Sequence, residues 1–449
     1  MRYPTNQTIR YKLSALLLLT TFLFSSSATA AQQTAETVGI LPIPDYSGHL
    51  SSRAWLLGDW NGSRTSLANK GVQMNIQSTQ TTQSIINGGR NEHSEFGGSL
   101  DYNMTLDLQK MGIAPGAIVK FRVESRYGDT VNQSAGPLLP VNTDGYFPLS
   151  SDDNITAAVT SLHLIQFLSE QFAVIIGKVD TLDGDLTEFA SGRGVTQFQN
   201  AAFVFNPVAG LTVPYSALAT GFLWLPNSNT EITSTFMNAQ DASTTSGFDD
   251  FGDGWLWSTE IKCQYQNDNK PGGMGISFLY AGDNDFLELG GRLSFDRNAG
   301  LDVATENESW YASWNVWQYL FTEEDHDGAI NLLDGTPDLQ GFGLFSRVGI
   351  ADDKTNPIDW SASIGLGGRG IFSGRNDDTF GVGYFYSSIQ SGLVLNDNRI
   401  DNSSEGGELF YNIALTPATA LTLNSQVVKS PFSNVDTAVI LGMRLNLKF

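Results

Sequence analysis

The clearest indication of the fold of this chain is the stretch V-I-L-G-M-R-L-N-L-K-F, Val439 to Phe449. Counted back from Phe449, apolar residues occupy alternate positions, namely Leu447, Leu445, Met443, Leu441 and Val439. The positions between them are polar or small, namely Lys448, Asn446, Arg444 and Gly442. A helix would spread both sets around its circumference, whereas a strand places them on opposite faces. The stretch therefore predicts a strand with one apolar and one polar face.

The same alternation runs through the rest of the chain. It is clear in 100–109, and Met111 to Gly116 then predicts a turn because it contains Pro115 and Gly116. The chain returns with Val119, Phe121, Val123 and Tyr127 on one face and with Lys120, Arg122, Glu124 and Arg126 on the other. Similar alternation recurs at 255–266, 380–386 and 408–415. These segments predict amphipathic strands joined as hairpins.

The amino terminus predicts export. A basic start with Arg2, Arg10 and Lys12 precedes an apolar run from Leu13 to Phe24, and Ala28-Thr29-Ala30 supplies small residues for cleavage. The run is too short to cross a hydrocarbon core of about 30 Å. We therefore expect a signal peptide at 1–30, then an extended segment with a short helix at 31–71, and one β unit at 72–449. The helix is expected within 58–70, with Gly71 ending it.

Composition excludes several classes of function. The chain has 25 Lys+Arg against 47 Asp+Glu and a formal charge of −22, which argues against a nucleic-acid partner because phosphate binding needs a basic surface. One cysteine, Cys263, excludes an internal disulfide framework and a cysteine-rich zinc site. With four histidines the chain offers little for a histidine metal cluster, and we expect no cofactor.

Strands of this kind can span a membrane in one fold only. The most apolar later stretch, 203–225, is interrupted by Pro207, Pro214 and Gly221, which argues against a spanning helix. Only helices and closed barrels satisfy the backbone within lipid. Aromatic residues gather in 310–319, as in the interfacial girdles of membrane barrels. We therefore predict an all-β fold, a transmembrane antiparallel β-barrel, with a secreted β-sandwich or a non-transporting barrel serving adhesion as the alternative.

Several blocks of sequence carry a family resemblance. They are L-L-G-D-W-N-G-S-R-T-S-L-A-N-K-G (56–71), F-S-R-V-G-I-A-D-D (345–353), N-P-I-D-W-S-A-S-I-G-L-G-G-R-G-I-F (356–372), G-R-N-D-D-T-F-G-V-G-Y (374–384) and E-L-F-Y-N-I-A-L-T-P (408–417). These blocks are similar to the carbohydrate-selective porin (OprB-like) family of bacterial outer membranes. The strand that ends at Phe449 also resembles the signal that outer-membrane barrels present to the barrel assembly machinery.

The resemblance implies a complete picture of the protein. It implies sixteen strands in the outer membrane, inward-folded loops, a constricted water-filled pore and passive diffusion of mono- and small oligosaccharides. Its partners would be carbohydrate solutes, outer-membrane lipid and the assembly machinery, and the amino-terminal segment would be periplasmic. The preferred sugar is left open, and so is the choice between a monomer and a homo-oligomer.

Candidate pore-lining residues follow from strand alternation, because the face opposite the lipid lines the lumen. The face of Lys120, Arg122, Glu124 and Arg126 mixes both charges and offers donors and acceptors to neutral hydroxylated solutes. Arg347 is expected to point inward because it alternates with Val348 and Ile350. Glu188 and Arg193 lie in D-G-D-L-T-E-F-A-S-G-R-G, which we expect to be a loop that can fold into the lumen or stay an ordinary polar loop.

Motifs for catalysis and metal binding are weak. Gly365, Gly367 and Gly370 fit G-x-G-x-x-G, but no helix follows to bind a dinucleotide, so strand glycines are expected. The side chains of His93 and Ser94 would point apart in an extended segment, so we predict no enzyme. The 323–334 segment approaches the spacing of a calcium loop without flanking helices, and a solvated acidic loop explains it better. We predict no metal site.

Overall fold

The computed structural model describes residues 38–148, 157–185, 187–249, 251–289, 293–296, 300–323, 339–390 and 400–449. The expected signal peptide at 1–30 and most of the 323–334 segment lie outside these residues. Gly39 to Phe449 forms one compact unit. Among the described residues, no helix combines the length and the hydropathy that a bilayer crossing requires.

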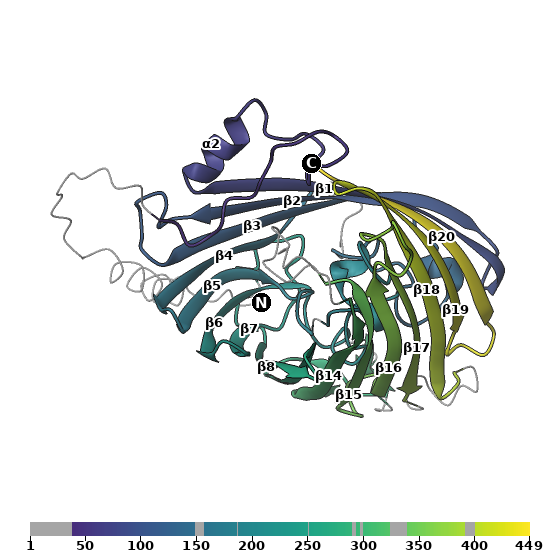
Figure 1. Cartoon of the computed structure of the whole chain (residues 1–449). Coiled ribbons are helices and arrows are strands. Elements are labelled where there is room, and N and C mark those ends of the chain that lie inside the picture. Colours follow the sequence, from purple (N-terminus) through teal and green to yellow (C-terminus); the bar gives the residue numbers. More distant parts are fainter. Residues whose placement is uncertain are drawn as a thin grey trace, which may run out of the picture. The chain divides into compact units, whose positions relative to one another are not determined.

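Sixteen strands pair antiparallel into a closed barrel, drawn in Figure 1. They are β1 (Val72–Gly89), β2 (Ser94–Asp107), β3 (Ala117–Gly128), β4 (Ala158–Ser169), β5 (Phe172–Asp180), β6 (Ser216–Asn227), β7 (Thr230–Asn238), β8 (Trp255–Asn267), β9 (Lys270–Gly282), β14 (Ser309–Thr322), β15 (Gly341–Ala351), β16 (Ile358–Arg369), β17 (Thr379–Ile389), β18 (Ser403–Thr416), β19 (Thr419–Lys429) and β20 (Asp436–Lys448). The barrel confirms the predicted fold class and strand number. The two-sheet sandwich is wrong, because this sheet closes on itself.

Smaller elements lie outside the barrel sheet. The helical ones are α2 (Ser63–Asn69), α3 (Asn132–Ala135), η1 (Gly192–Gly194) and α4 (Ala201–Val204). Two small hairpins are made by β10 (Phe286–Leu287) with β13 (Thr305–Glu306) and by β11 (Leu293–Asp296) with β12 (Gly300–Val303). Helix α2 falls within the expected 58–70, and Gly71 follows it with a φ of 88°, a conformation that favours glycine.

Strand alternation sorts side chains between lipid and lumen. On β20, Leu441 and Met443 are exposed on the outside, whereas Arg444 and Asn446 are buried within the barrel. The exposed face is apolar because it meets acyl chains, and the polar side chains point into the lumen. The pattern read from the last eleven residues is confirmed.

The amino-terminal segment (residues 39–70) lies against the seam where β1 meets β20 (Figure 1). Arg64 donates from Nη2 to the carbonyl oxygens of Met74 (2.7 Å) and Phe449 (3.0 Å). Its guanidinium carbon lies 4.3 Å from the ring centre of Tyr46 and 4.5 Å from that of Trp55. The buried cation is therefore held by aromatic faces and main-chain oxygens together.

Most connections are short at one end of the barrel, where 323–340 is the long exception, and the longest connections lie at the other end. Two-residue turns at 170–171, 228–229 and 268–269 lie at the end where β1 begins, which we call the turn end. Connections at 129–157, 181–215 and 239–254 lie at the opposite end, the loop end. The connection at 181–215, here named the lumen loop, folds into the barrel and lies within the ring of strands in Figure 1.

Candidate functional site: the constricted lumen

Three buried phenylalanines of the lumen loop rest on glycines of the barrel wall. A Cβ atom added to Gly343 or Gly367 would lie 2.6 or 2.7 Å from Phe189. Added atoms at Gly381 and Gly383 would lie 2.8 Å from Phe198 and 2.6 Å from Phe203. Rings therefore fill the space where side chains of β15–β17 would stand, and this part of the lumen is plugged. The glycines of the G-x-G-x-x-G pattern belong to this wall, with Gly365 and Gly367 in β16 and Gly370 just after it.

Buried polar side chains of the same wall anchor the main chain of the lumen loop. Arg347 on β15 donates to Asp185 Oδ2 (2.9 Å), to the carbonyl oxygen of Asp185 (2.8 Å) and to that of Phe203 (2.7 Å). Arg347 Nη2 also donates to the carbonyl oxygen of Ala190. The arginine thus ties three separate points of the loop to one strand.

Two further strands hold the middle of the lumen loop. The Glu408 carboxylate on β18 accepts the amide hydrogens of Gln199 (2.7 Å) and Asn200 (2.8 Å). Arg444 on β20 donates from Nη2 to the carbonyl oxygen of Gln197 (2.8 Å). Each contact gives a buried polar group a hydrogen-bond partner. Leaving such a group without its partner would cost about 1–3 kcal/mol. The loop is therefore fixed on one side of the lumen.

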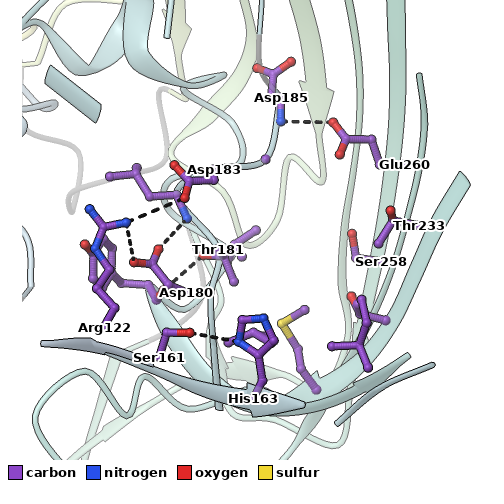
Figure 2. Close-up of a pocket in the computed structure, with 18 of the residues that line it drawn as sticks. Arg122, Ser161, His163, Asp180, Thr181, Asp183, Asp185, Thr233, Ser258 and Glu260 are labelled. Atoms are coloured by element: carbon purple, nitrogen blue, oxygen red, sulfur yellow. Dashed lines mark hydrogen bonds and ion pairs between the residues drawn. The ribbon is translucent and has the colours of Figure 1, made fainter. Parts of the chain in front are cut away.

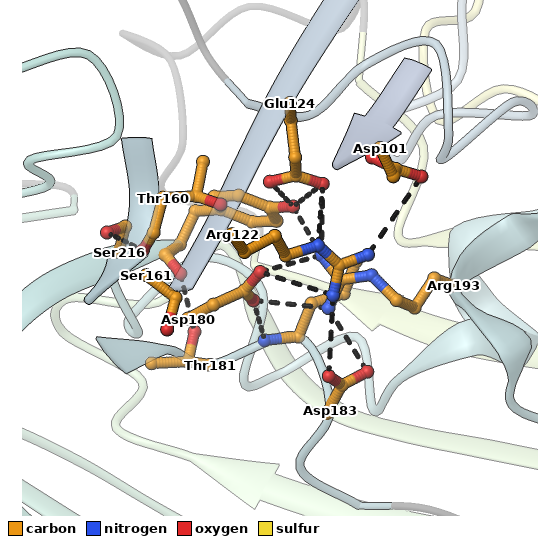
Figure 3. Close-up of polar contacts among 12 residues, drawn as sticks. Asp101, Arg122, Glu124, Thr160, Ser161, Asp180, Thr181, Asp183, Arg193 and Ser216 are labelled. Atoms are coloured by element: carbon orange, nitrogen blue, oxygen red, sulfur yellow. Dashed lines mark hydrogen bonds and ion pairs between the residues drawn. The ribbon is translucent and has the colours of Figure 1, made fainter. Parts of the chain in front are cut away.

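A network of paired charges borders the other side of the loop (Figure 3). Arg193 Nη2 lies 2.8 Å from Asp180 Oδ2 and 3.3 Å from Glu124 Oε1. The Tyr215 hydroxyl lies 2.8 Å from Glu124 Oε2, to which it donates. Arg122 reaches Asp183 with an Nη1 to Oδ2 distance of 3.7 Å. The loop residue Arg193 thus joins β3 and β5 through their carboxylates.

The network extends along β3 and holds more carboxylates than arginines. Arg126 lies 3.6 Å from Asp101, 3.4 Å from Glu124 and 3.8 Å from Asp144, measured between guanidinium nitrogens and carboxylate oxygens. The pairs join three arginines to five carboxylates: Arg122, Arg126 and Arg193 to Asp101, Glu124, Asp144, Asp180 and Asp183. Each charge thus has a partner of opposite sign, which weakens the field of the two carboxylates in excess.

Two carboxyl groups of the lumen loop, outside the spanning strands, differ in their electrostatics. Burial raises the pKa of the Asp183 carboxyl, but Arg193 and then Arg122 outweigh burial and hold that pKa below its usual value. Burial raises the pKa of the Asp185 carboxyl, and Arg347 offsets only part of this rise. Asp183 is therefore the carboxylate that presents a stable negative charge to the lumen.

A cavity of about 690 Å³, cavity 1, lies beside the loop (Figure 2). Hydroxyl and amide side chains line one part of it, namely Asn75, Asn103, Thr105, Thr233, Thr235, Ser258, Ser277 and Ser313. Apolar side chains line another part, and they include Phe147, Leu182, Phe205 and Val213. Arg122 and His163 lie on one side, and Glu260 lies across from them (Figure 2). The hydroxyl oxygen of Ser161 lies 2.9 Å from His163 Nδ1. The cavity offers hydrogen-bonding groups in several directions.

The seven residues singled out from sequence occupy different places. Lys120 and Arg122 line cavity 1, and Glu188 lines a second cavity of about 610 Å³, cavity 2. Glu124, Arg126 and Arg193 form the charge network behind cavity 1. Arg347 points inward but is 1% exposed, and it holds the lumen loop. That each of these residues contacts solute stays a prediction. The buried place of Arg347 favours a role in positioning the lumen loop.

Sequence reasoning missed most partners of these residues. Asp180 and Asp183 stand in V-D-T-L-D-G-D directly after an apolar run, and this acidic cluster at a strand end could have been a signal. Tyr215 and Asp144 come from separate connections, and nothing in their sequence neighbourhood marks them. Phe198 and Phe203 look like ordinary apolar residues because their glycine partners are distant in sequence.

Comparisons with known proteins fit this architecture. The family model described as carbohydrate-selective porin, OprB family, matches residues 94–449. The chain belongs to this family. This OprB-family member is thus a sugar-selective outer-membrane porin, and family and fold together indicate a channel.

Individual relatives of this OprB-family porin are distant in sequence. Porin B of Pseudomonas aeruginosa is 21% identical over 441 residues, covering 88% of this chain and 91% of the relative. The high-pH structure of Pseudomonas putida OprB superposes with a TM-score of 0.73 at 20% identity, over 90% of this chain and all of that one. The low-pH structure of the same protein gives a TM-score of 0.56 at 16% identity, over 89% and 99%. These structures share the fold of the chain.

Proposed function

We propose that neutral sugars diffuse passively through cavity 1, between the lumen loop and the wall made by β1–β5, β7–β9 and β14. The observation that carries this proposal is the lining of cavity 1, which combines hydroxyls, amides and charges of both signs. Sugars shed part of their hydration in a narrow pore, and such a wall replaces the lost hydrogen bonds. Paired charges do so without a strong field of one sign, which would favour ions over neutral solutes.

The charged residues divide into two roles under this proposal. Lys120, Arg122 and Asp183 touch solute, because they line the cavity with nitrogen and oxygen atoms that form hydrogen bonds. Glu124, Arg126 and Arg193 are positioning residues that hold the lumen loop at the right distance from β3. Arg347 positions the same loop from β15. Glu188, within the loop, helps to fix it by accepting a hydrogen bond from the Tyr319 hydroxyl on β14 (2.9 Å).

The orientation in the membrane is also part of the proposal. We place the turn end and the amino-terminal segment in the periplasm, because bacterial outer-membrane barrels have short periplasmic turns and longer extracellular loops. The alternating β20 strand, which Phe449 follows, supports recognition by the barrel assembly machinery. Carbohydrate solutes then enter from the loop end.

Liposome swelling with a panel of mono- and oligosaccharides tests the proposed function. Proteoliposomes should swell in isosmotic monosaccharide at a rate that falls with saccharide size, and charged solutes of similar size should enter more slowly. In planar bilayers the protein should give discrete conductance steps that added sugar reduces. A pore that shows equal swelling for sugars and equally sized anions or cations, with no block by sugar, would contradict the proposal.

A further inference from the structure

Cavity 2 has a composition that the proposed path through cavity 1 does not use. It lies among β7–β9, β14 and β16–β17, and Lys262 lines both cavities. Its lining combines the aromatic side chains of Trp317 and Tyr319 with Glu231, Lys262 and Gln264. Lys262 therefore borders both cavities, and its amine lies 2.9 Å from Glu260 Oε2 and 3.6 Å from Glu231 Oε1.

Trp317 on β14 stands over a glycine of the next strand. Gly273 on β9 is paired with Trp317, and a Cβ added to Gly273 would lie 2.5 Å from Nε1 and 2.7 Å from Cε2 of the indole. The indole therefore fills the space that a side chain at position 273 would take. Phe189 and Tyr319 lie nearly perpendicular to the indole, with interplanar angles of 87° and 82°. From this position Trp317 lines cavity 2.

Polar side chains of β8 lie near Trp317 in the barrel wall. Gln264 is paired with Gly273, so Gln264, Gly273 and Trp317 form one row across three strands. Glu231 and Lys262 are paired in the adjoining row, where Gly275 takes the β9 position. The Trp317 indole occupies the space above Gly273, and the Asn315 side chain occupies the space above Gly275. The lining of cavity 2 thus combines an aromatic ring with an amide, an amine and a carboxylate.

This combination fits a pyranose ring. The C–H face of a sugar is apolar and packs on an aromatic face, while its hydroxyls need donors and acceptors around the ring edge. Each cavity has a volume in the range of ligand pockets. We infer that cavity 2 is a second saccharide subsite, with Trp317 as its platform, and that it takes the next unit of an oligosaccharide whose first unit occupies cavity 1.

The inference rests on the proposed function and names its substrate class. A chain of two or more sugar units would span both cavities past Lys262, whereas a monosaccharide is held in cavity 1 alone. Loss of the platform should therefore weaken binding of longer saccharides selectively. A residue that merely supports the barrel would affect saccharides of all lengths.

Sugar block of ion current in planar bilayers tests the inference, with glucose and maltotriose as probes. Trp317→Ala should raise the Kd for maltotriose roughly 3- to 10-fold, the loss expected for one aromatic contact, and change the Kd for glucose less than about 2-fold. Gly273→Val should have the same effect without removing the indole, because its side chain would displace the ring. Trp317→Tyr should restore part of the affinity. Trp314→Ala is the matched control, since Trp314 faces outward on the same strand and is 41% exposed.

The outcomes separate the inference from the proposed function. Heat-modifiable migration on gels verifies that each variant has folded as a barrel. An unchanged maltotriose-to-glucose Kd ratio in both Trp317→Ala and Gly273→Val would overturn the second subsite, and so would an equal effect of Trp314→Ala. Equal weakening of both sugars would assign Trp317 a supporting role and overturn the inference. A wild-type pore that neither sugar blocks would overturn the proposed function together with the inference.

Discussion

Replacing Arg347 by alanine should release the lumen loop while the barrel persists. Arg347 is buried and pairs with Asp185, which is also buried, and its other hydrogen bonds reach the carbonyl oxygens of Asp185, Ala190 and Phe203. The substitution leaves the Asp185 carboxylate without its cation, which costs about 3–5 kcal/mol when a buried pair is broken. The barrel itself is closed by main-chain pairing between strands and does not depend on this contact.

That cost sets the size of the expected effect. At about 1.4 kcal/mol for each tenfold change, the displaced loop should become roughly 10²- to 10³-fold more populated relative to the docked loop. Single-channel recordings of Arg347→Ala should therefore show transitions to larger conductance and a weaker block by glucose. The gel mobility of the folded barrel should be unchanged.

Two companion variants make this prediction specific. Arg375→Ala is the matched control, because Arg375 also pairs with an aspartate, Asp378, but lies in the connection between β16 and β17 at the turn end. Adding Asp185→Ala to Arg347→Ala should recover part of the wild-type block, since no buried carboxylate is then left without a cation. Identical conductance and glucose block in Arg347→Ala and wild type would refute the anchoring role.

Three further predictions concern other parts of the chain. Gly383→Val should push Phe203 off the wall and change the conductance, and Phe203→Ala in the same chain should restore it, as checked by single-channel recording; a conductance that Gly383→Val leaves unaltered would contradict the packing of ring on glycine. Exchanging both Arg122 and Arg126 for alanine should alter the Kd for sugars several-fold while insertion stays intact, and unchanged swelling rates across a sugar panel would count against this assignment. Arg64→Ala should destabilise the amino-terminal segment by about 2 kcal/mol, the scale of a desolvated cation–π contact, and so speed proteolysis within 45–70; the exposed Lys70→Ala serves as control, and equal cleavage of both would argue against the aromatic cage.

Much of the fold could be predicted from local sequence. Alternation in 100–109 and in 439–449 has a period of two, and lipid on one side and water on the other impose that period directly. The inward direction of Arg347 followed from the same rule. Strand count came from family resemblance, because each strand signal is weak and does not mark its neighbours.

The contents of the lumen were harder to predict, since they depend on contacts between distant segments. Alternation gives the face on which Arg122 and Arg347 lie, but not their depth along the barrel. Arg122 therefore came to line a cavity and Arg347 came to lie beneath the lumen loop. Trp317 was visible as one aromatic among several in 310–319, and only its pairing with Gly273 shows that its ring fills the space above that glycine.

Because Phe203 packs on Gly383, a substitution at one of these two positions constrains which residue can stand at the other. A larger residue at the wall demands a smaller one in the loop, and a smaller ring leaves a void that a methyl group at the wall could fill. Related porins that carry alanine or valine at the wall position should therefore carry a reduced side chain at the loop position. Transplanting one of these loops into another family member would succeed only when the receiving strand travels with it.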